Sequence, residues 1–584
     1  MTSAPPHCTN IEEARRILEH DIEVETKKVV DLKIRLNQLV PIARLPPELL
    51  SEIFLQCITM NAPNNRLFHR TMSHTSRWKV TQVCHYWREV ALHCPSLWSQ
   101  IEVSGPETDC ISEMLTRSKK ASLTVHADIF DPRDTKGVKK VLSEVDRIKS
   151  LEISAVRTAF TDVFDTPPTS APRLKRIVIR NASASADDIP PFFSNCSLPS
   201  LQVVQLYNFP IPFTHPFFAS TLTRLVFVAF ASAHYTTPRV SDLTHMLTGM
   251  PLLQHLEYSG VLIGDDAGPR NVALTRLSYL NLYNDFSSQI LPFGKLLDHL
   301  SIPSSAKVLL DFTSAELIDI LPHLTASIIR MLTGDGRIGG VTPLRAFSIR
   351  NQAEGNTSGC VLSFWPDARS LKERKSPYPE PPFRIALPWV ANLSDETWAF
   401  CRALPLSNVE ACVLGCSPRE QQEGPNFAEW QKTLGQMRKL VWLRVAGEGG
   451  TYFPDLLERL NHPEGSGKKR SAKLETLIME GVKFRPVKEL TSDVYIKDLI
   501  RVISELPNLK KLELKDCVNF GHADYAGFVK KDIPATWDRN VKFEKNLDYG
   551  GFLYDLDSED GMDDTDMWDS DIDEADDNII FGLF

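Results

Sequence analysis

A short basic stretch near the C-terminal third of the chain has residue types that could bind phosphate. The stretch "HPEGSGKKR", residues 462–470, has the glycines and the lysine of a loop that cradles phosphate through backbone N–H groups. His462 stands where such a loop needs its first glycine, and Lys469 stands where it needs the Ser or Thr that holds magnesium. We therefore expect an ordinary surface loop.

Two other groups of residues have types suited to metal binding. Asp555, Asp557 and Glu559 have the spacing of the first ligands of a calcium loop, but Asp560 stands where the loop needs its turning glycine. Cys412 and Cys416 are closely spaced, but no second pair of His or Cys residues completes a zinc site. We expect no metal and no cofactor.

Residues with the spacing of catalytic motifs are also missing from the sequence. There is no GxSxG or HExxH motif, and no complete phosphate loop. No basic stripe with interleaved aromatic residues indicates nucleic-acid binding. We therefore expect a protein without catalytic residues and without a nucleic-acid partner.

The overall composition is that of a folded, multidomain chain. It has 584 residues, of which 42% are hydrophobic and 24% charged. No window reaches the roughly 20 apolar residues of a membrane span, and the start "MTSAPPHCTN" has no secretory signal pattern. The eleven cysteines include no CxxC pair and are expected to be mostly buried thiols. These features predict an intracellular protein, cytoplasmic or nuclear, without a membrane partner.

The charge is distributed unevenly along the chain. Residues 555–577 hold thirteen carboxylates and no Lys or Arg. The rest of the chain has 65 basic and 61 acidic residues, so it is nearly neutral. A segment with so much like charge and so little apolar content does not fold alone. The sequence therefore predicts a disordered acidic tail.

The first long element is a helix with one apolar stripe. In a heptad assignment, Ile11, Leu18, Glu25, Leu32 and Leu39 occupy d positions, and Arg15, Ile22, Val29 and Leu36 occupy a positions. The helix should end before Pro41. Such a stripe fits a coiled coil between two copies of the chain, and it equally fits packing on the next domain of the same chain.

Two short amphipathic helices follow within residues 41–100. Pro47 and Glu48 suit the first turn of a helix, and the stretch "LPPELLSEIFLQC" continues it with a wide apolar face. A second helix is expected from about Trp78 to Leu92, closed by "CPSLW". So few residues make a very small core, so we expect apolar surface to be shared with a neighbour.

This module resembles the F-box, in particular the F-box-like proteins of mushroom-forming fungi. The matching pattern is Leu45-Pro46-x-Glu48-Leu49-Leu50-x-x-Ile53-Phe54, then "VCHYWR" from Val83, then "PSLW". The polar link Met60–Arg77 is longer than the link of compact F-boxes.

In that family the F-box docks on the Skp-type adaptor of a cullin-RING ubiquitin ligase, and the rest of the chain recognises the substrate. The resemblance implies the following adaptor-binding residues: Leu45, Pro46, Glu48, Leu49, Leu50, Ile53, Phe54, Val83 and Trp87.

After Trp98 a short pattern, apolar-x-x-apolar-x-apolar, recurs, and neighbouring copies are 21 to 35 residues apart where no long gap intervenes. This is the size of one leucine-rich repeat, in which a strand lines one side and a helix or loop returns on the other. The copies begin at Ile148, Leu174, Leu201, Leu222, Leu253, Leu277, Leu344, Leu440, Leu474 and Leu509. Between Gly334 and Pro405 the pattern fades, which indicates an insertion with an exposed loop around Arg369 to Pro382.

We therefore predict an α/β fold with an irregular leucine-rich-repeat solenoid, although alternating strands and helices also suit an ordinary parallel sheet. The expected organisation is disorder over 1–10, an amphipathic helix over 11–40, the F-box-like module over 41–100, repeats over 101–535 with an insertion at about 350–400, and an acidic tail over 536–584.

The pattern and the resemblance together suggest a substrate-recognition subunit of a Skp-cullin-F-box-type ubiquitin ligase. The F-box-like module would bind the adaptor, and the concave face of the repeats would bind a protein substrate. The alternative is a repeat-built scaffold that binds partner proteins, and associates with itself through residues 11–40, without a ligase.

Overall fold

The structure is a computed structural model. It describes residues 11–542 except for 61–78, 105–107, 131–133, 164–167, 183–192, 210–211, 230–237, 266, 269–270, 284–290, 313–320, 335–336, 340–342, 355–356, 373–379, 389–399, 416–432, 447–453, 455–456, 459–472 and 485–493. The disorder predicted for residues 1–10 and the carboxylate run 555–577 lie outside the described residues. No helix in the described part is long and apolar enough to cross a membrane.

The N-terminal part is helical, as the sequence predicts. Its elements are α1 Ile11–Gln38, η1 Pro41–Arg44, α2 Pro47–Met60, α4 His85–Leu92 and η2 Pro95–Trp98. Pro41 and Pro47 each begin a helix, where the missing backbone N–H has no cost. The long amphipathic helix and the start of the second helix are therefore confirmed.

A sheet of 17 strands makes up the rest of the described chain. Every neighbouring pair is parallel except the two that involve β14. In spatial order the strands are β1 Gln100–Val103, β2 Leu123–Ile129, β3 Ile148–Ala155, β4 Arg176–Asn181, β5 Val203–Tyr207, β6 Arg224–Val228, β7 His255–Ser259, β9 Tyr279–Tyr283, β11 Lys307–Asp311, β15 Phe383–Pro388, β14 Thr357–Trp365, β13 Ala346–Glu354, β16 Ala411–Gly415, β17 Trp442–Ala446, β18 Thr476–Glu480, β19 Lys511–Lys515 and β20 Ala535–Trp537.

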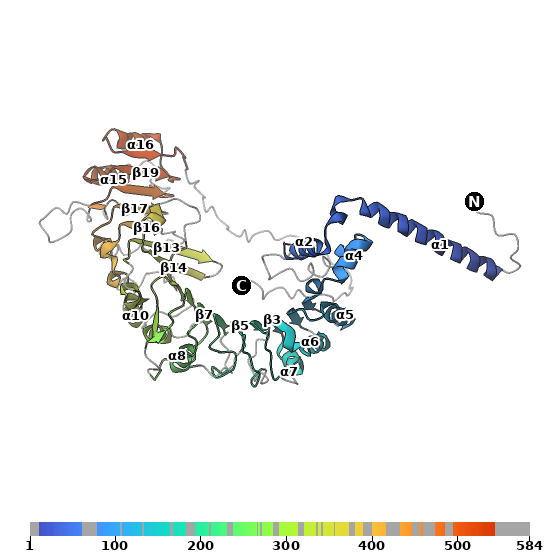
Figure 1. Cartoon of the computed structure of the whole chain (residues 1–584). Helices are drawn as coiled ribbons and strands as arrows, with labels where there is room; N and C mark the ends of the chain where they lie inside the picture. Colours follow the sequence, from blue (N-terminus) through green and yellow to red (C-terminus); the bar gives the residue numbers. More distant parts are fainter. Residues whose placement is uncertain are drawn as a thin grey trace, which may run out of the picture. The chain divides into compact units, whose positions relative to one another are not determined.

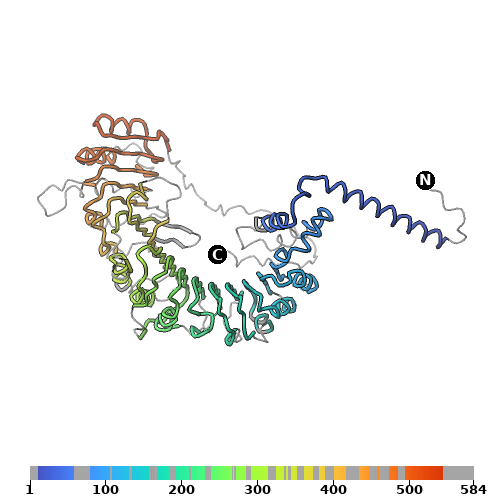
Figure 2. Tube along the Cα trace, viewed as in Figure 1, coloured from blue at the N-terminus to red at the C-terminus, as the bar shows by residue number. Residues whose placement is uncertain are grey.

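The helices in the segments between strands vary in length from one segment to the next. Figure 1 shows α6, α7 and α8 on one side of the strands, and in Figure 2 the colours follow the sequence along the strands of residues 100–283. The helices are α5 Thr108–Ser118, α6 Thr135–Leu142, η4 Val145–Arg147, α7 Arg157–Val163, α8 Val240–Thr248, α9 Leu291–His299, α10 Leu321–Thr333, η5 Leu406–Asn408, α15 Val494–Ser504 and α16 His522–Val529. Three short strands, β8 Val272–Ala273, β10 Leu300–Pro303 and β12 Arg337–Ile338, form a separate small sheet.

The recurring sequence pattern coincides with the strands. Nine of its ten copies begin two residues before a strand, as Leu174 does before β4, and the tenth begins at the first residue of β3. The leading residue and every second strand residue are buried in one continuous core. The α/β array with leucine-rich-repeat-like strands is thereby confirmed, and alternate burial explains the pattern, because successive strand side chains point to opposite faces.

The N-terminal module shares this core. Trp98 stands two residues before β1, the place that leucines occupy before later strands, and it is fully buried. Its indole N–H donates to the carbonyl oxygen of Ala91 at 2.7 Å, and the Arg117 guanidinium of α5 lies 4.6 Å from its ring centroid. The last residues of the module therefore also form the first repeat.

An insertion interrupts the array between β11 and β13. The reversed strand β14 pairs with β13 on one side and with β15 on the other, and β15 pairs in parallel with β11. Helix α11, Arg369–Lys372, follows β14 and lies at the start of the predicted loop. The sheet thus continues through the insertion.

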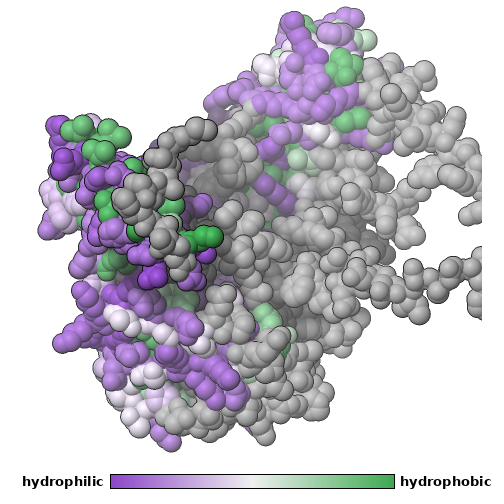
Figure 3. All heavy atoms as spheres, turned by 90° about the vertical axis from the view of Figure 1, so that its right-hand side faces the viewer, coloured by the Kyte–Doolittle hydropathy of each residue, from purple (hydrophilic) through white to green (hydrophobic). Residues whose placement is uncertain are grey.

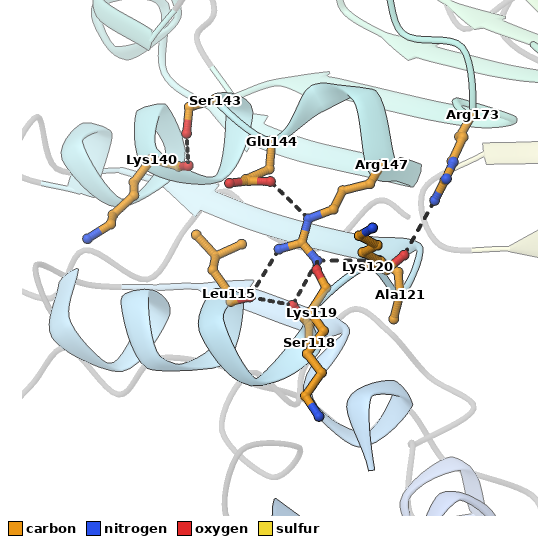
Figure 4. A network of polar contacts seen from close by, with 10 residues as sticks. All are labelled: Leu115, Ser118, Lys119, Lys120, Ala121, Lys140, Ser143, Glu144, Arg147 and Arg173. Carbon is orange, nitrogen blue, oxygen red and sulfur yellow. Dashed lines mark hydrogen bonds and ion pairs between the residues drawn. The ribbon is translucent and has the colours of Figure 1, made fainter. Parts of the chain in front are cut away.

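Arg147 connects the segment before β3 to the C-terminus of α5. Arg147 precedes β3, and its guanidinium donates to the carbonyl oxygen of Leu115 and to Oγ of Ser118, each at 3.1 Å, and also to the carbonyl oxygen of Lys119 (Figure 4). These acceptors lie at the C-terminus of α5, where carbonyls have no partner within the helix. Lys119 is in the left-handed conformation that ends the helix, with φ 49°. Glu144 accepts from Arg147 Nε at 3.0 Å.

We expect Arg147→Met to lower the free energy of unfolding by about 1.5–3 kcal/mol, because buried acceptors lose charged donors while the aliphatic stem is kept. The measurement is urea denaturation of the full chain. Arg173→Met is the matched control, because the Arg173 guanidinium makes one exposed hydrogen bond, to the carbonyl oxygen of Lys120 at 3.4 Å. Equal losses in the two variants would contradict this role for Arg147.

Candidate functional site

Helix α2 has two apolar stripes with different surroundings. Leu50 and Phe54 are fully buried, and the Phe54 ring lies 5.1 Å from the Trp87 ring of α4, centroid to centroid. Leu49 is 55% exposed and Ile53 is 37% exposed, one helical turn apart. Cys57 continues this second stripe by another turn and is also exposed. The inner stripe builds the core of the module, and the outer stripe faces solvent.

The residues before α2 are held against α4. The Tyr86 hydroxyl donates to the carbonyl oxygen of Leu45 at 2.7 Å, and Leu45 is half-buried. Pro46 and Glu48 are exposed at the start of α2. On this side of the molecule hydrophobic residues lie in small groups among hydrophilic ones (Figure 3).

The second helix differs from the expected single helix over 78–92. Residues 79–81 are helical, the chain then turns, and α4 begins at His85. The break occurs because Cys84 is extended, with φ −157°, and its sulfur accepts from the backbone N–H of Trp87 as a helix cap. Val83 lies in the break and is 57% exposed.

The predicted adaptor-binding residues therefore divide into three groups. Leu50 and Phe54 are fully buried in the core of the module. Leu45 and Trp87 are half-buried. The remaining five are exposed: Pro46, Glu48, Leu49, Ile53 and Val83. Cys57 was absent from the predicted set, although its spacing of four residues after Ile53 places it on the same stripe.

A second candidate surface is the strand face opposite the core in the N-terminal half of the sheet, which we call the polar strand face and define as the core-averted residues of β2 to β9. Its central row runs in register through Glu152, Val178, Gln205, Val226 and Glu257. The two valines are buried, although they do not belong to the main core. The row therefore has an apolar middle between two carboxylates.

Cations surround Glu152 at one end of this row. Arg176 Nη1 lies 3.1 Å and His126 Nδ1 lies 3.3 Å from Glu152 Oε2, and Arg180 donates to Glu152 Oε1. Burial alone would raise the pKa of Glu152, but hydrogen bonds with His126 and Arg180 outweigh it and hold that pKa far below its usual range. Glu152 is therefore a structural anion that orients the two arginines.

Aromatic side chains flank the row. The Arg180 guanidinium lies 4.8 Å from the ring centroid of Tyr207, and the rings of His255 and Tyr279 stack with centroids 4.3 Å apart. None of these residues was predicted from the sequence to belong to a site. The signal was available, because His255 and Tyr279 occupy variable positions within the repeat pattern, and Arg180 and Tyr207 directly follow its last apolar residue.

An apolar cluster covers part of the corresponding face in the C-terminal half. Ala346, Ala411, Val413, Trp442 and Ile478 lie on it and form a second apolar cluster with three residues of the insertion, Trp365, Ala368 and Leu371. Figure 1 shows β13, β14, β16 and β17 gathered in this part of the sheet. On the polar strand face, Arg224 is exposed and Glu257 is half-buried, while Val178 and Val226 are buried.

Most residues of the phosphate-like and metal-like stretches have no described position. Residues 462–470, Asp555–Glu559 and Cys416 lie outside the described residues. Cys412 is buried in β16, and burial raises its pKa; burial likewise raises the pKa of Cys401 to about 12. Among the described residues no three His, Cys, Asp or Glu side chains form a group that could hold a metal ion.

Comparison with known proteins identifies the N-terminal module. The F-box-like family matches residues 42–104, which span α2, α4, η2 and β1. No curated protein matches the chain.

We expect Glu152→Gln to lower the free energy of unfolding at pH 7 by about 1.5–3 kcal/mol, because Arg176 and Arg180 lose a charged acceptor. The folded pKa lies below the unfolded value of about 4.3, so this stabilisation is complete above that pH and is lost as the pH falls toward the folded pKa. The difference in the free energy of unfolding between variant and wild type, measured by urea denaturation, should therefore be smaller at pH 3 than at pH 7.

The control for this measurement is Glu257→Gln. Glu257 lies in the same row as Glu152, and its carboxylate is 3.6 Å from His255 Nε2. A Glu152→Gln gap that stays constant with pH would refute the assigned role of the carboxylate.

Proposed function

We propose that this protein is the substrate-recognition subunit of a Skp-cullin-F-box-type ubiquitin ligase. The observation that supports this most is the F-box-like match over residues 42–104 together with the exposed stripe of α2. The module completes its own core with Leu50 and Phe54, whereas Leu49 and Ile53 keep exposed apolar surface. Exposed apolar residues in such a group mark an interaction site.

The Skp-type adaptor binds, in this proposal, to the outer stripe of α2 and the residues around it. Leu49, Ile53 and Cys57 form the apolar centre, and Pro46 with Glu48 contacts the adaptor from the N-terminus of the helix. Val83, Leu45 and Trp87 extend the surface toward α4. An apolar centre with a polar rim is the usual composition of such interfaces.

The protein substrate binds to the polar strand face. This choice follows from the second apolar cluster, which covers the equivalent face of β13 and β16 to β18. Arginine and tyrosine are enriched among residues that dominate binding energies, and Arg176, Arg180, Tyr207, Arg224 and Tyr279 provide both types.

The contribution of the chain to ubiquitin transfer is proximity. The module and the strand face share one core, so a bound substrate is held at a fixed place relative to the adaptor. Holding a lysine near the ubiquitin-loaded enzyme raises its effective concentration without chemistry from this chain. The protein acts without a cofactor and without catalytic residues of its own, and it works inside the cell, where the ligase is found.

We expect Leu49→Asp with Ile53→Asp to weaken adaptor binding at least tenfold, because two desolvated apolar contacts are replaced by charges. The measurement is titration of the full chain with purified Skp-type adaptor. In wild type, bound adaptor should also slow alkylation of Cys57, followed by peptide mass spectrometry.

Val494→Asp with Val529→Asp is the matched control, since both valines are exposed and lie on α15 and α16 at the far end of the sheet. This variant should bind like wild type. A wild-type chain that does not bind the adaptor would exclude the ligase role and leave a repeat-built scaffold.

We expect Arg224→Glu to reduce ubiquitination of the proteins that depend on this chain, because a charge on the polar strand face is reversed while the adaptor surface is intact. The measurement is quantitative ubiquitin proteomics in cells that express the variant in place of wild type. Lys530→Glu, an equal charge change at an exposed site beyond α16, should have no effect. If the two variants gave equal ubiquitination profiles, the substrate would have to bind outside the polar strand face.

A further inference from the structure

Helix α1 exposes its apolar side chains along its whole length. It has 28 residues, none is buried, and Ile11, Ile22, Leu32 and Leu36 are each more than 60% exposed. Both interpretations from the sequence required a cover for this stripe. The described residues of the same chain do not provide it, and an exposed apolar surface of this extent marks an interaction site.

The heptad stripe is the seam along which another helix would pack. Seven of its nine a and d positions are apolar, and the exceptions are Arg15 and Glu25. Each exception has an ion partner on its own helix, because Arg15 Nε lies 2.8 Å from Glu19 and Lys28 Nζ lies 2.8 Å from Glu25. The stripe can therefore pack against a second amphipathic helix whose charged residues complement those of α1.

A parallel pair of α1 helices places like charges together. Parallel packing sets each a and d residue against its own equivalent, so Arg15 meets Arg15 of the second copy and Glu25 meets Glu25. It also sets g residues beside e residues five positions later, which brings Lys28 to Lys33 of the second copy. All three contacts are repulsive.

In an antiparallel pair, each of these repulsive contacts is replaced by a contact with a different residue. Layers then join a to d, so Leu18 packs on Val29 of the second copy, Arg15 on Leu32, and Glu25 on Ile22. Antiparallel packing also sets e beside e and g beside g.

The flanking charges then attract in both directions. Glu12 meets Lys33 of the second copy, and Asp21 meets Lys28, each contact occurring twice by symmetry.

The register is also selected by charge. Sliding the antiparallel pair by one heptad toward the C-terminus sets Lys28 against Lys28 of the second copy. Sliding it toward the N-terminus sets Glu19 against Glu19 and Asp21 against Asp21. The register with Leu18 beside Val29 avoids these pairs and overlaps residues 11–36 of both helices.

We propose that α1 pairs with α1 of a second copy of this chain as an antiparallel coiled coil, with its centre between Glu23 and Val24. The helix is about 42 Å long, so the two F-box-like modules leave from opposite ends of the coil. The assembly is a two-armed receptor. Two arms on one partner raise the apparent affinity for substrates that offer two binding segments.

The first test is the self-association of the purified full chain without adaptor, measured by light scattering and analytical ultracentrifugation. Wild type, with a chain mass of 65.8 kDa, should form a dimer. Lys33→Glu should raise the dimer Kd about tenfold, because it reverses two attractive contacts. In a parallel dimer the same change would relieve repulsion with Lys28 and lower the Kd.

Lys27→Glu is the matched control, because position 27 lies on the back of the helix at heptad position f. It should leave the Kd unchanged. A monomeric wild type, or a Lys33→Glu variant whose dimer Kd is unchanged or lower, would overturn the proposal.

Disulfide trapping tests the orientation and register directly. Leu18→Cys with Val29→Cys in one chain should link two copies under mild oxidation, with the bond between the new cysteines identified by mass spectrometry. Leu18→Cys alone should cross-link no faster than wild type. Rapid cross-linking through Leu18→Cys alone would show a parallel pair and overturn the proposal. Because the adaptor is absent from both tests, their outcome is independent of the ligase role.

Discussion

The burial of Trp98 is the constraint on which the arrangement of this protein depends. Nine later strands have a leucine two residues before them, and before β1 this place is taken by the last aromatic residue of the F-box-like module. The indole bond to Ala91 joins it to α4, and the Arg117 guanidinium joins it to α5. Module and repeats are therefore packed as one body, since interiors at close packing density transmit displacement.

This coupling gives the two faces of the sheet different tasks. The core-directed face is apolar in every strand because each strand relies on its neighbours for cover. The opposite face is free to vary, and the chain uses it in two ways. Over β13 and β16 to β18 the insertion adds a second apolar cluster, whereas over β2 to β9 charged and aromatic residues surround two buried valines.

The sequence was sufficient for much of this architecture, because burial imposes periodicity. Nine copies of the repeat pattern predicted strands, and each of these strands begins two residues after its copy begins. Pro47 predicted the start of α2. β11 was missed since Ser305 stands where a leading leucine was sought, and the reversed strand β14 has no counterpart in the repeat pattern. Local pattern also failed at Cys84, where an extended residue interrupts the expected helix.

The candidate site shows the same division between what pattern determines and what packing determines. Helical spacing places Leu49, Ile53 and Cys57 on one stripe, but it does not tell which stripe of α2 faces solvent. The contact between Phe54 and Trp87 decides that, and Trp87 lies more than thirty residues later in the chain. The charged row around Glu152 likewise depends on strand register, because its members come from four consecutive repeats. Recognition surfaces of repeat proteins are assembled across repeats, so no single repeat contains their chemistry.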